Sequence, residues 1–290
     1  GGVPKETPAL TLNRLCGSGL QAIISAAQAI ALGDTDVALA GGAESMSRSG
    51  YVMPAARWGQ RMGDEALMDW MVGALSDPFD KQHMGVTAER IAAKWGISRE
   101  VQDALAVESH RRAGRAQTEG RFKAQILPVE LKGKKGPVIF DTDEHVRGDA
   151  TLEDMAKLRA VFQKDGSVTA GNASGLNDAA AAVVLTERSV AERKGLKPLG
   201  RLVAYGHAGV DPAIMGIGPI PAVTNAMQKA GLTVADMDVI ESNEAFAAQA
   251  CAVANDLEFD PAKTNPNGGA VALGHPIGAT GCLITIKALY

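Results

Sequence analysis

Hydrophobic residues recur at helical spacing shortly after the start of the chain. Five of them follow the pattern i, i+3, i+4, i+7, i+10, which predicts an amphipathic helix with one buried face; they are Leu20, Ile23, Ile24, Ala27 and Ile30. Apolar segments at 9–12 and 37–40 flank this helix, and the second is a continuous run typical of a strand covered on both faces. We therefore predict a β-α-β unit of a parallel sheet.

The pattern changes between about Glu44 and Ser167, where methionine, tryptophan and charged residues are mixed with short helical stretches. Helices are predicted over 86–95 and 99–114, and an exposed turn over 133–136. A long insertion between β-α units is commonly a lid or a binding subdomain, so we expect this region to contact a ligand.

Regular alternation of strand and helix patterns resumes at Asn177. The elements expected there are a strand over 179–185, a strand near 201–205, a helix near 222–230, a strand at 237–241, a helix over 245–254 and a final strand-turn-helix over 267–290. The chain is thus predicted to be an α/β protein with two lobes.

Composition excludes several classes of protein. The chain has 290 residues, 46% of them hydrophobic, and a net charge of −4, which is incompatible with intrinsic disorder. Its 33 acidic residues outnumber 29 basic ones, so no nucleic-acid partner is expected, and no apolar stretch approaches the length of a membrane helix. Three widely spaced cysteines favour a reducing, cytoplasmic location.

The ends of the chain suggest an excerpt from a longer protein. The sequence begins at Gly1 without methionine and stops at Tyr290 inside a helical pattern that has no glycine or polar stop. A targeting segment, if the parent protein has one, would lie outside the sequence.

Cys16 is the first candidate for chemistry. It stands in a glycine-rich turn, 16–19 (Cys-Gly-Ser-Gly), that leads into the first predicted helix. The positive end of a helix dipole favours a thiolate, and glycines allow close approach of a substrate. Free cysteines are also commonly buried for packing alone, and the motif leaves both interpretations open.

His275 and Asn243 are the other polar residues at the ends of predicted strands or turns. His275 lies between Gly274 and Pro276, and a cysteine–histidine pair is the usual way to activate a sulfur nucleophile. Asn243 follows an apolar strand and precedes a helix, where it could cap the helix or face the ligand crevice of an α/β sheet. His275 could instead satisfy only loop carbonyls.

Other glycine-rich, cysteine and histidine positions carry weaker signals. The loop 169–175 (Thr-Ala-Gly-Asn-Ala-Ser-Gly) suits backbone hydrogen bonding to a ligand but lacks a nucleotide-binding pattern. Cys251 and Cys282 lie on apolar helical faces and are interpreted as core residues. No histidine has a partner at metal-ligand spacing, so no metal is predicted.

Four motifs occur in a fixed order along the chain. They are 13–19 (Asn-Arg-Leu-Cys-Gly-Ser-Gly), 41–47 (Gly-Gly-Ala-Glu-Ser-Met-Ser), 243–247 (Asn-Glu-Ala-Phe-Ala) and 268–278 (Gly-Gly-Ala-Val-Ala-Leu-Gly-His-Pro-Ile-Gly). Together they resemble the signatures of the thiolase family, the acetyl-CoA acetyltransferases and 3-ketoacyl-CoA thiolases, and the resemblance covers essentially the whole chain.

The resemblance implies a layered α/β/α/β/α fold with two similar halves. Residues 1–45 and 177–197 would form an incomplete N-terminal half, 46–176 an inserted CoA-binding loop domain, and 198–290 an incomplete C-terminal half. Short-chain relatives also suggest a homotetramer or homodimer.

The activity implied by the resemblance is a reversible Claisen condensation of two acetyl-CoA, or of acyl-CoA and acetyl-CoA, to a 3-ketoacyl-CoA. Cys16 would carry the acyl group as a thioester, His275 would activate it, and Asn243 would position a water at the enolate oxygen. Acyl-CoA and CoA are the implied partners, and no cofactor beyond CoA is implied.

Contacts to CoA carry over from the resemblance one residue at a time. Those implied for the pantetheine arm, the acyl pocket, the adenine and the tunnel to the nucleophile are Leu75, His83, Met84, Arg147, Ala170, Ser174, Ala245 and Phe246. The triplet 83–85 (His-Met-Gly) is similar to that of short-chain acetoacetyl-CoA thiolases.

One signature of the family is absent from the sequence. Thiolases carry a second catalytic cysteine in a C-terminal CxGGG motif, and Cys282 lacks those glycines. The opening strands of the family's first half are missing as well, which would leave exposed sheet edges and unburied helix faces. We therefore expect the 290-residue chain to be poorly stable and unable to complete condensation by itself. The alternatives are a non-catalytic CoA-binding relative or truncated product, and a ketoacyl synthase, which would use two histidines where this chain has Asn243.

Overall fold

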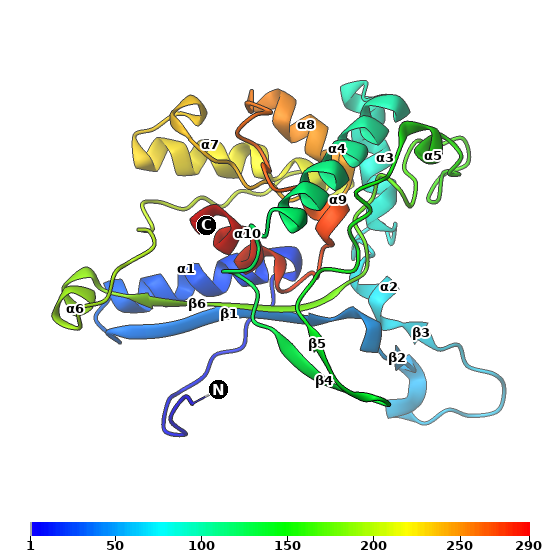
Figure 1. Ribbon diagram of the computed structural model, residues 1–290. Coiled ribbons are helices and arrows are strands. Elements are labelled where there is room, and N and C mark those ends of the chain that lie inside the picture. Colours follow the sequence, from blue (N-terminus) through cyan, green and yellow to red (C-terminus); the bar gives the residue numbers. More distant parts are fainter. Residues whose placement is uncertain (1) are drawn as a thin grey trace.

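A pair of long antiparallel strands crosses the lower part of the protein in the computed structural model, which describes residues 2–290 (Figure 1). Strand β1 (Val37–Ser45) pairs with β6 (Asp178–Thr186) along its whole length, with Val37 opposite Thr186 and Ser45 opposite Asp178. The prediction of strands at 37–40 and 179–185 is confirmed, but the prediction of a parallel β-α-β unit is wrong. β1 finds its partner more than 130 residues further along the chain, and that partner runs in the opposite direction.

Helices α1 (Ser18–Ala31) and α10 (Thr280–Leu289) lie on one face of this strand pair (Figure 1). The apolar face predicted for α1 supplies Ile23, which packs with Ala40 of β1 and Cys282 of α10 in a buried cluster. Burial of such aliphatic side chains provides the main driving force for the layer. On the other face of the pair, Leu39 and Val184 are exposed.

A second helical layer lies above α10 (Figure 1). It consists of α3 (Met84–Trp95), α4 (Arg99–Thr118), α7 (Pro219–Ala230), α8 (Ala247–Asp256) and the short α9 (Ala270–Leu273). α8 is rich in alanine and packs against both α3 and α4, with Cys251 and Ala252 buried against Ile91 of α3. These helices confirm the predictions over 86–95, 99–114, 222–230 and 245–254, and the prediction that Cys251 and Cys282 are core residues.

Local signals explain where two of these helices begin and end. The His83 side chain accepts a hydrogen bond from the Gly85 N–H at the start of α3, and Ser98 does the same for Val101 at the start of α4. Gly96 ends α3 in the left-handed conformation with φ of 64°, which glycine adopts without strain.

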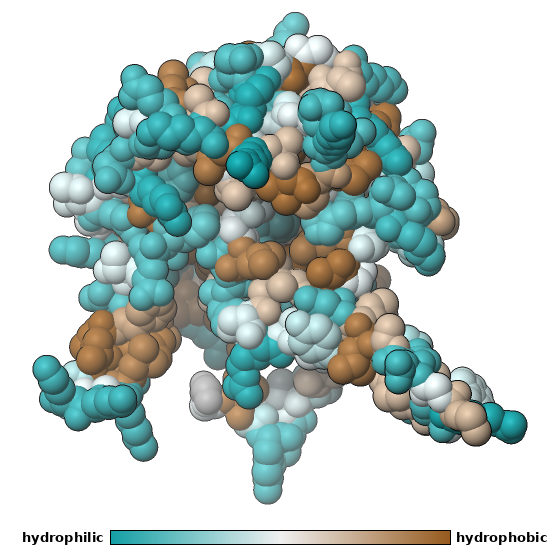
Figure 2. Space-filling view, turned by 90° about the vertical axis from the view of Figure 1, so that its right-hand side faces the viewer, coloured by the Kyte–Doolittle hydropathy of each residue, from teal (hydrophilic) through white to brown (hydrophobic). Residues whose placement is uncertain are grey.

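Two segments extend from the body. The hairpin of β4 (Val129–Gly133) and β5 (Gly136–Phe140) is exposed along its length and turns at the predicted position. Strands β2 (Tyr51–Val52) and β3 (Met68–Asp69) form a second extension, followed by α2 (Trp70–Ala74). Figure 2 shows a cluster of hydrophobic residues on one of the lower extensions and further hydrophobic patches across the middle of this face, whereas the tips of the extensions are hydrophilic.

The remaining helical elements are short. They are η1 (Leu15–Gly17), η2 (Met46–Arg48), η3 (Pro54–Trp58), α5 (Leu152–Ala156), α6 (Arg188–Arg193), η4 (Pro212–Ile217) and η5 (Val234–Asp236). Within residues 2–290, no helix has the length and apolarity needed to cross a membrane.

Several predicted strands do not form. Segments 9–12 and 201–205 have no strand pairing among the described residues, and 237–241 makes only a single bridge, from Ile240 to Thr264. The last 24 residues contain α9 and α10 but no strand in the described structure. A strand needs a hydrogen-bonding neighbour, and Leu10 lies 79% exposed without one, so an apolar pattern alone was insufficient.

Candidate active site

The first and last helices of the chain cross at two glycines. A Cβ added to Gly19 of α1 would lie 2.7 Å from the backbone nitrogen of Cys282, and one added to Gly281 of α10 would overlap Leu20. Only glycine permits this approach. Gly19 was predicted to give a substrate access to Cys16, whereas in the structure it lets α1 approach α10 and so brings the segments of Cys16 and His275 together.

Cys16 lies in the turn η1 that precedes α1. Ser18 Oγ accepts a hydrogen bond of 2.8 Å from the Arg14 N–H, and Asn13 Oδ1 accepts one of 2.9 Å from the Leu15 N–H. Leu15 has a φ of 47°, a conformation that costs a non-glycine residue free energy and that occurs often at functional sites. The turn therefore holds Cys16 in a defined position.

The Cys16 thiol is protonated at neutral pH. Burial raises its pKa to about 11, a hydrogen bond from its own backbone lowers it less, and the charge of Glu44 raises it further. Burial therefore opposes the thiolate that the helix start was expected to favour, because desolvation raises the pKa of Cys16 more than the backbone hydrogen bond lowers it. Nucleophilic attack by Cys16 needs a base.

His275 is a buried base in a segment close to this turn. It lies in the segment before α10, whose first turns contact η1, and it is 6% exposed. Burial lowers the pKa of His275 to about 4, so the imidazole is neutral at pH 7 and can accept a proton.

Thr280 determines which ring nitrogen of His275 is free. Thr280 Oγ1 donates to the Pro276 carbonyl at 3.0 Å and lies 2.6 Å from His275 Nδ1. With its single proton donated to the Pro276 carbonyl, the hydroxyl accepts from Nδ1–H, and in that tautomer Nε2 keeps its lone pair. Nε2 is buried and has no hydrogen-bond partner in the described part of the chain.

We expect Thr280→Val to lower the rate of Cys16 acylation about tenfold, because valine keeps the shape but cannot hold Nδ1–H. The measurement is a single-turnover reaction with acetyl-CoA. Thr285→Val is the matched control: Thr285 is also in α10, and its hydroxyl donates only to the Gly281 carbonyl. Equal rates for the two variants would contradict the assigned role.

We also expect the rate of Cys16 acylation to decrease only at strongly acidic pH. Because the pKa of His275 is lowered to about 4, its neutral form persists well below the ordinary histidine value of 6.5. We expect the single-turnover rate to stay flat from about pH 7.5 to 5.5 and to fall as His275 protonates near pH 4. A half-maximal rate near pH 6.5 would contradict this.

The same shift has a consequence for stability. Unfolded His275 takes up a proton near its ordinary pKa, whereas folded His275 does so only near pH 4. The unfolded state therefore binds more protons between these values, and the contribution of His275 to the free energy of unfolding decreases as pH falls through this range.

Asn243 does not cap a helix, since α8 begins at Ala247 after Phe246. Its neighbours are instead fixed by one buried asparagine: Asn265 Oδ1 accepts from the Ser242 N–H, and Asn265 Nδ2 donates to the Ser242 carbonyl and to Glu244. Asn243 Oδ1 itself is buried without a partner among residues 2–290. Such an atom costs free energy unless a ligand or water satisfies it.

The residues implied for the acyl pocket form one group. The Met84 N–H donates to the Leu75 carbonyl at 2.8 Å, and the His83 ring stacks on Phe162 at 4.7 Å. Phe162 meets Phe246 edge to face at 6.0 Å. Phe162 was not identified from the sequence, where nothing distinguishes it from other isolated aromatics.

The loop 172–175 connects this group with the catalytic segments. The Ser174 N–H donates to the Ala245 carbonyl at 3.0 Å, and the Gly175 carbonyl accepts from the His275 N–H. Ser174 and Ala245 therefore lie side by side. Ala170 and Arg147 are exposed, and Arg147 shares none of these contacts in the described structure; its N–H donates to His110 Nδ1.

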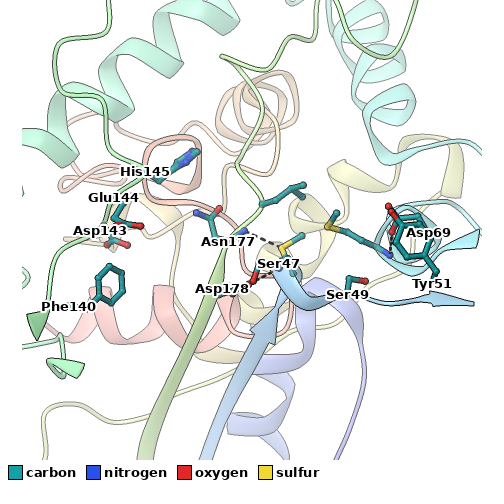
Figure 3. Close-up of a pocket in the computed structure, with 13 residues that line it drawn as sticks. Ser47, Ser49, Tyr51, Asp69, Phe140, Asp143, Glu144, His145, Asn177 and Asp178 are labelled. Atoms are coloured by element: carbon teal, nitrogen blue, oxygen red, sulfur yellow. Dashed lines mark hydrogen bonds between the residues drawn. The ribbon is translucent and has the colours of Figure 1, made fainter. Parts of the chain in front are cut away.

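A cavity of about 740 Å³ lies beside the candidate site. Figure 3 shows Asn177, Asp178 and Ser47 on one side of it and Phe140, Asp143, Glu144 and His145 on the other. Asn177 packs on Gly274, next to His275, but none of the predicted site residues lines the cavity.

The side chains of the candidate site point to one class of protein. Residues 2–290 contain no group of three or more histidine, cysteine, aspartate or glutamate side chains that could hold a metal ion. A protonated thiol, a neutral histidine with one free nitrogen and an apolar aromatic group, all on an α/β fold, are the features of an enzyme with a cysteine nucleophile.

Comparisons with known proteins give the family. Residues 1–189 match the family described as thiolase, N-terminal domain, and residues 196–290 match thiolase, C-terminal domain. The chain is 69% identical to beta-ketothiolase BktB of Cupriavidus necator and 55% identical to an acetyl-CoA acetyltransferase of Allochromatium vinosum, covering all of this chain and 74% of each relative.

Solved structures agree with these relatives. Human mitochondrial 3-ketoacyl-CoA thiolase superposes with a TM-score of 0.97 at 47% identity, over 99% of this chain and 73% of the human one. The same human enzyme in complex with CoA superposes with a TM-score of 0.95 at 46% identity, over 99% and 72% of the two chains. The chain belongs to the thiolase family.

Proposed function

We propose that this protein is an acyl-CoA C-acetyltransferase that catalyses reversible Claisen condensation through an acyl thioester on Cys16. The family and the names of its relatives support the activity. The single structural observation that carries it is the close packing of α1 on α10, which brings the turn of Cys16 near the segment of the buried His275.

The first half-reaction follows from the protonation states of Cys16 and His275. Nε2 of His275 takes the thiol proton while Cys16 Sγ attacks the thioester carbonyl of acetyl-CoA. The bond from the carbonyl carbon to the CoA sulfur then breaks, and the departing CoA thiolate receives the proton from His275. The products are acetyl-Cys16 and CoA, and thioester is exchanged for thioester.

In the second half-reaction a base must remove an α-proton from another acetyl-CoA; in the family this base is the C-terminal cysteine whose motif these 290 residues lack, so the step would need the longer parent protein. The carbanion attacks the carbonyl carbon of acetyl-Cys16, the bond from that carbon to Sγ breaks, and the Cys16 thiolate takes up the proton held by the base. The enolate oxygen would be held by His275 and by a water on Asn243, whose side-chain oxygen is buried without a partner among residues 2–290. Hydrogen bonds aimed at a developing oxyanion are commonly worth about 3–4 kcal/mol each.

The groups that would bind CoA rest on the same reasoning. The group formed by Leu75, His83, Met84 and Phe162 would enclose the acyl end and part of the pantetheine arm. Ser174 and Ala170 would hydrogen-bond the pantetheine arm, and Ala245 and Phe246 would line the tunnel to Cys16. Residues 46–176 would form the inserted CoA-binding loop domain, with Arg147 and Ala170 at its exposed side. No cofactor beyond CoA is required by these steps.

We also propose a homotetramer or homodimer in the cytoplasm. Exposed apolar residues on the β4–β5 hairpin, such as Leu131 and Ile139, support assembly, and three cysteines without a disulfide support a reducing compartment. Light scattering of the purified chain would measure the oligomeric state.

Incubation with acetyl-CoA followed by peptide mass spectrometry tests the proposed function. We expect one acetyl group on the Cys16 peptide, and none in Cys16→Ala. The sample should behave identically after dialysis against a metal chelator. A folded protein that binds CoA but does not become acetylated would instead be a non-catalytic CoA-binding member of the family.

A further inference from the structure

Glu44 connects the strand β1 with the segment that follows His275. It is the second-to-last residue of β1, and its Oε2 accepts a hydrogen bond of 2.9 Å from the Gly278 N–H. A Cβ added to Gly278 would lie 3.2 Å from this oxygen, so the carboxylate is in contact with the loop. The bond joins parts of the chain that are 234 residues apart.

The contact between strand and loop is close on both sides of Glu44. A Cβ on Gly42 would overlap the Gly278 carbonyl and lie 2.9 Å from Ala279 Cα, and Gly278 Cα faces the Ala43 carbonyl. The loop between His275 and α10 thus lies directly on the β1 backbone. In this contact the Glu44 carboxylate supplies the hydrogen bond that fixes where the loop lies along the strand.

Few other hydrogen bonds hold this loop to its surroundings. The His275 N–H donates to the Gly175 carbonyl at a long 3.4 Å, whereas Ala279 N–H and Thr280 N–H both donate within the loop, to Pro276. Of these two hydrogen bonds from the loop to other segments, the one from the Gly278 N–H to Glu44 is the shorter. Loss of this bond would free the backbone three residues after His275.

Glu44 also acts on Cys16 through its charge. The carboxylate raises the pKa of Cys16, which opposes formation of the nucleophilic thiolate. A neutral amide could accept the same hydrogen bond from Gly278 without this electrostatic effect. The two influences of Glu44 can therefore be separated by substitution.

We propose that Glu44 is a positioning residue of the acyl-transfer site, whose carboxylate holds the His275 loop on β1 so that His275 can reach the proton of Cys16. The proposal rests on the proposed function, because it assigns Glu44 to the same cysteine–histidine pair. Displacement of a catalytic group by about 1 Å can cost about 10²-fold in rate, so a bond of this kind has a measurable effect.

Alkylation of Cys16 by iodoacetamide at pH 7.5 tests the proposal without acetyl-CoA. In Glu44→Gln the amide oxygen still accepts from Gly278 and the charge is gone, so we expect alkylation at least as fast as in the wild type. In Glu44→Ala the acceptor is lost as well, and we expect alkylation to be slower by about tenfold. Only loss of the acceptor, and not loss of the charge, is therefore expected to slow alkylation. Glu130→Gln and Glu130→Ala, on the exposed strand β4, are the matched controls and should not change it.

A double variant identifies the residue through which Glu44 acts. In a His275→Ala background, Glu44→Ala should cause no further slowing, because the loop then has no base to position. The proposal is overturned if both Glu44 variants alkylate faster than the wild type, which would leave only the charge effect. It is also overturned if the slowing by Glu44→Ala persists without His275. A wild type that alkylates but is not acetylated would refute the proposed function separately.

Discussion

Replacing His275 by alanine is expected to slow acetylation of Cys16 by about two to four orders of magnitude. With a pKa raised to about 11, only about one Cys16 thiol in 10⁴ is ionised at pH 7, and the variant would depend on that fraction. In the wild type, Nε2 accepts the proton during attack and removes this dependence. The measurement is single-turnover acetylation followed by mass spectrometry.

Two further measurements make the result specific to the base. His207→Ala removes an exposed histidine that contacts Gln21 and should leave the rate unchanged. Added imidazole should restore part of the rate in His275→Ala, since it can occupy the space left by the side chain. A rate within about fivefold of the wild type, without imidazole, would show that another group activates Cys16.

Gly42→Ala is expected to lower the free energy of unfolding by roughly 3 kcal/mol or more, at the upper end of overpacking substitutions. The added Cβ would overlap the Gly278 carbonyl oxygen and lie 2.8 Å from the Gly278 carbonyl carbon. The three atoms nearest to this Cβ all belong to the backbone, so the overlap cannot be relieved by rotating a side chain. Urea unfolding followed by circular dichroism measures the change, and Cys16 acetylation should fall in the fraction that stays folded.

Gly209→Ala provides the comparison. A Cβ at Gly209 meets no atom within 4 Å, and we expect its effect on the free energy of unfolding to stay within about 0.5 kcal/mol. If Gly42→Ala were equally well tolerated, the loop of His275 would have room to move off β1, and the close contact between them would carry no functional constraint.

Helices were predictable from the sequence because their signals are local. The apolar face of α1 and the glycine that ends α3 each lie within one segment of the chain. Strands were less predictable. The apolar run 9–12 resembles 37–40 in pattern, but only the second has a partner among the described residues, and that partner lies in β6. The residues of a strand do not indicate a partner that lies so far along the sequence.

The residues of the candidate site likewise include some that were predictable from the sequence and some that were not. Cys16, His275 and Asn243 were identified because each stands in a distinctive motif. The roles of Thr280 and Glu44 became visible only from the hydrogen bonds to His275 and Gly278. The raised pKa of Cys16 could not be predicted from the sequence, because the amount of burial depends on elements far along the chain.

The crossing of α1 and α10 at Gly19 and Gly281 has a consequence for folding kinetics. These glycines are more than 250 residues apart, so forming the contact closes a loop that contains most of the chain, and its entropic cost is met only after other parts have folded. The helices of the upper layer can form from contacts of shorter range. During refolding, reactivity at Cys16 should therefore return later than the helical circular dichroism signal. The delay would measure when α1 and α10 come into contact.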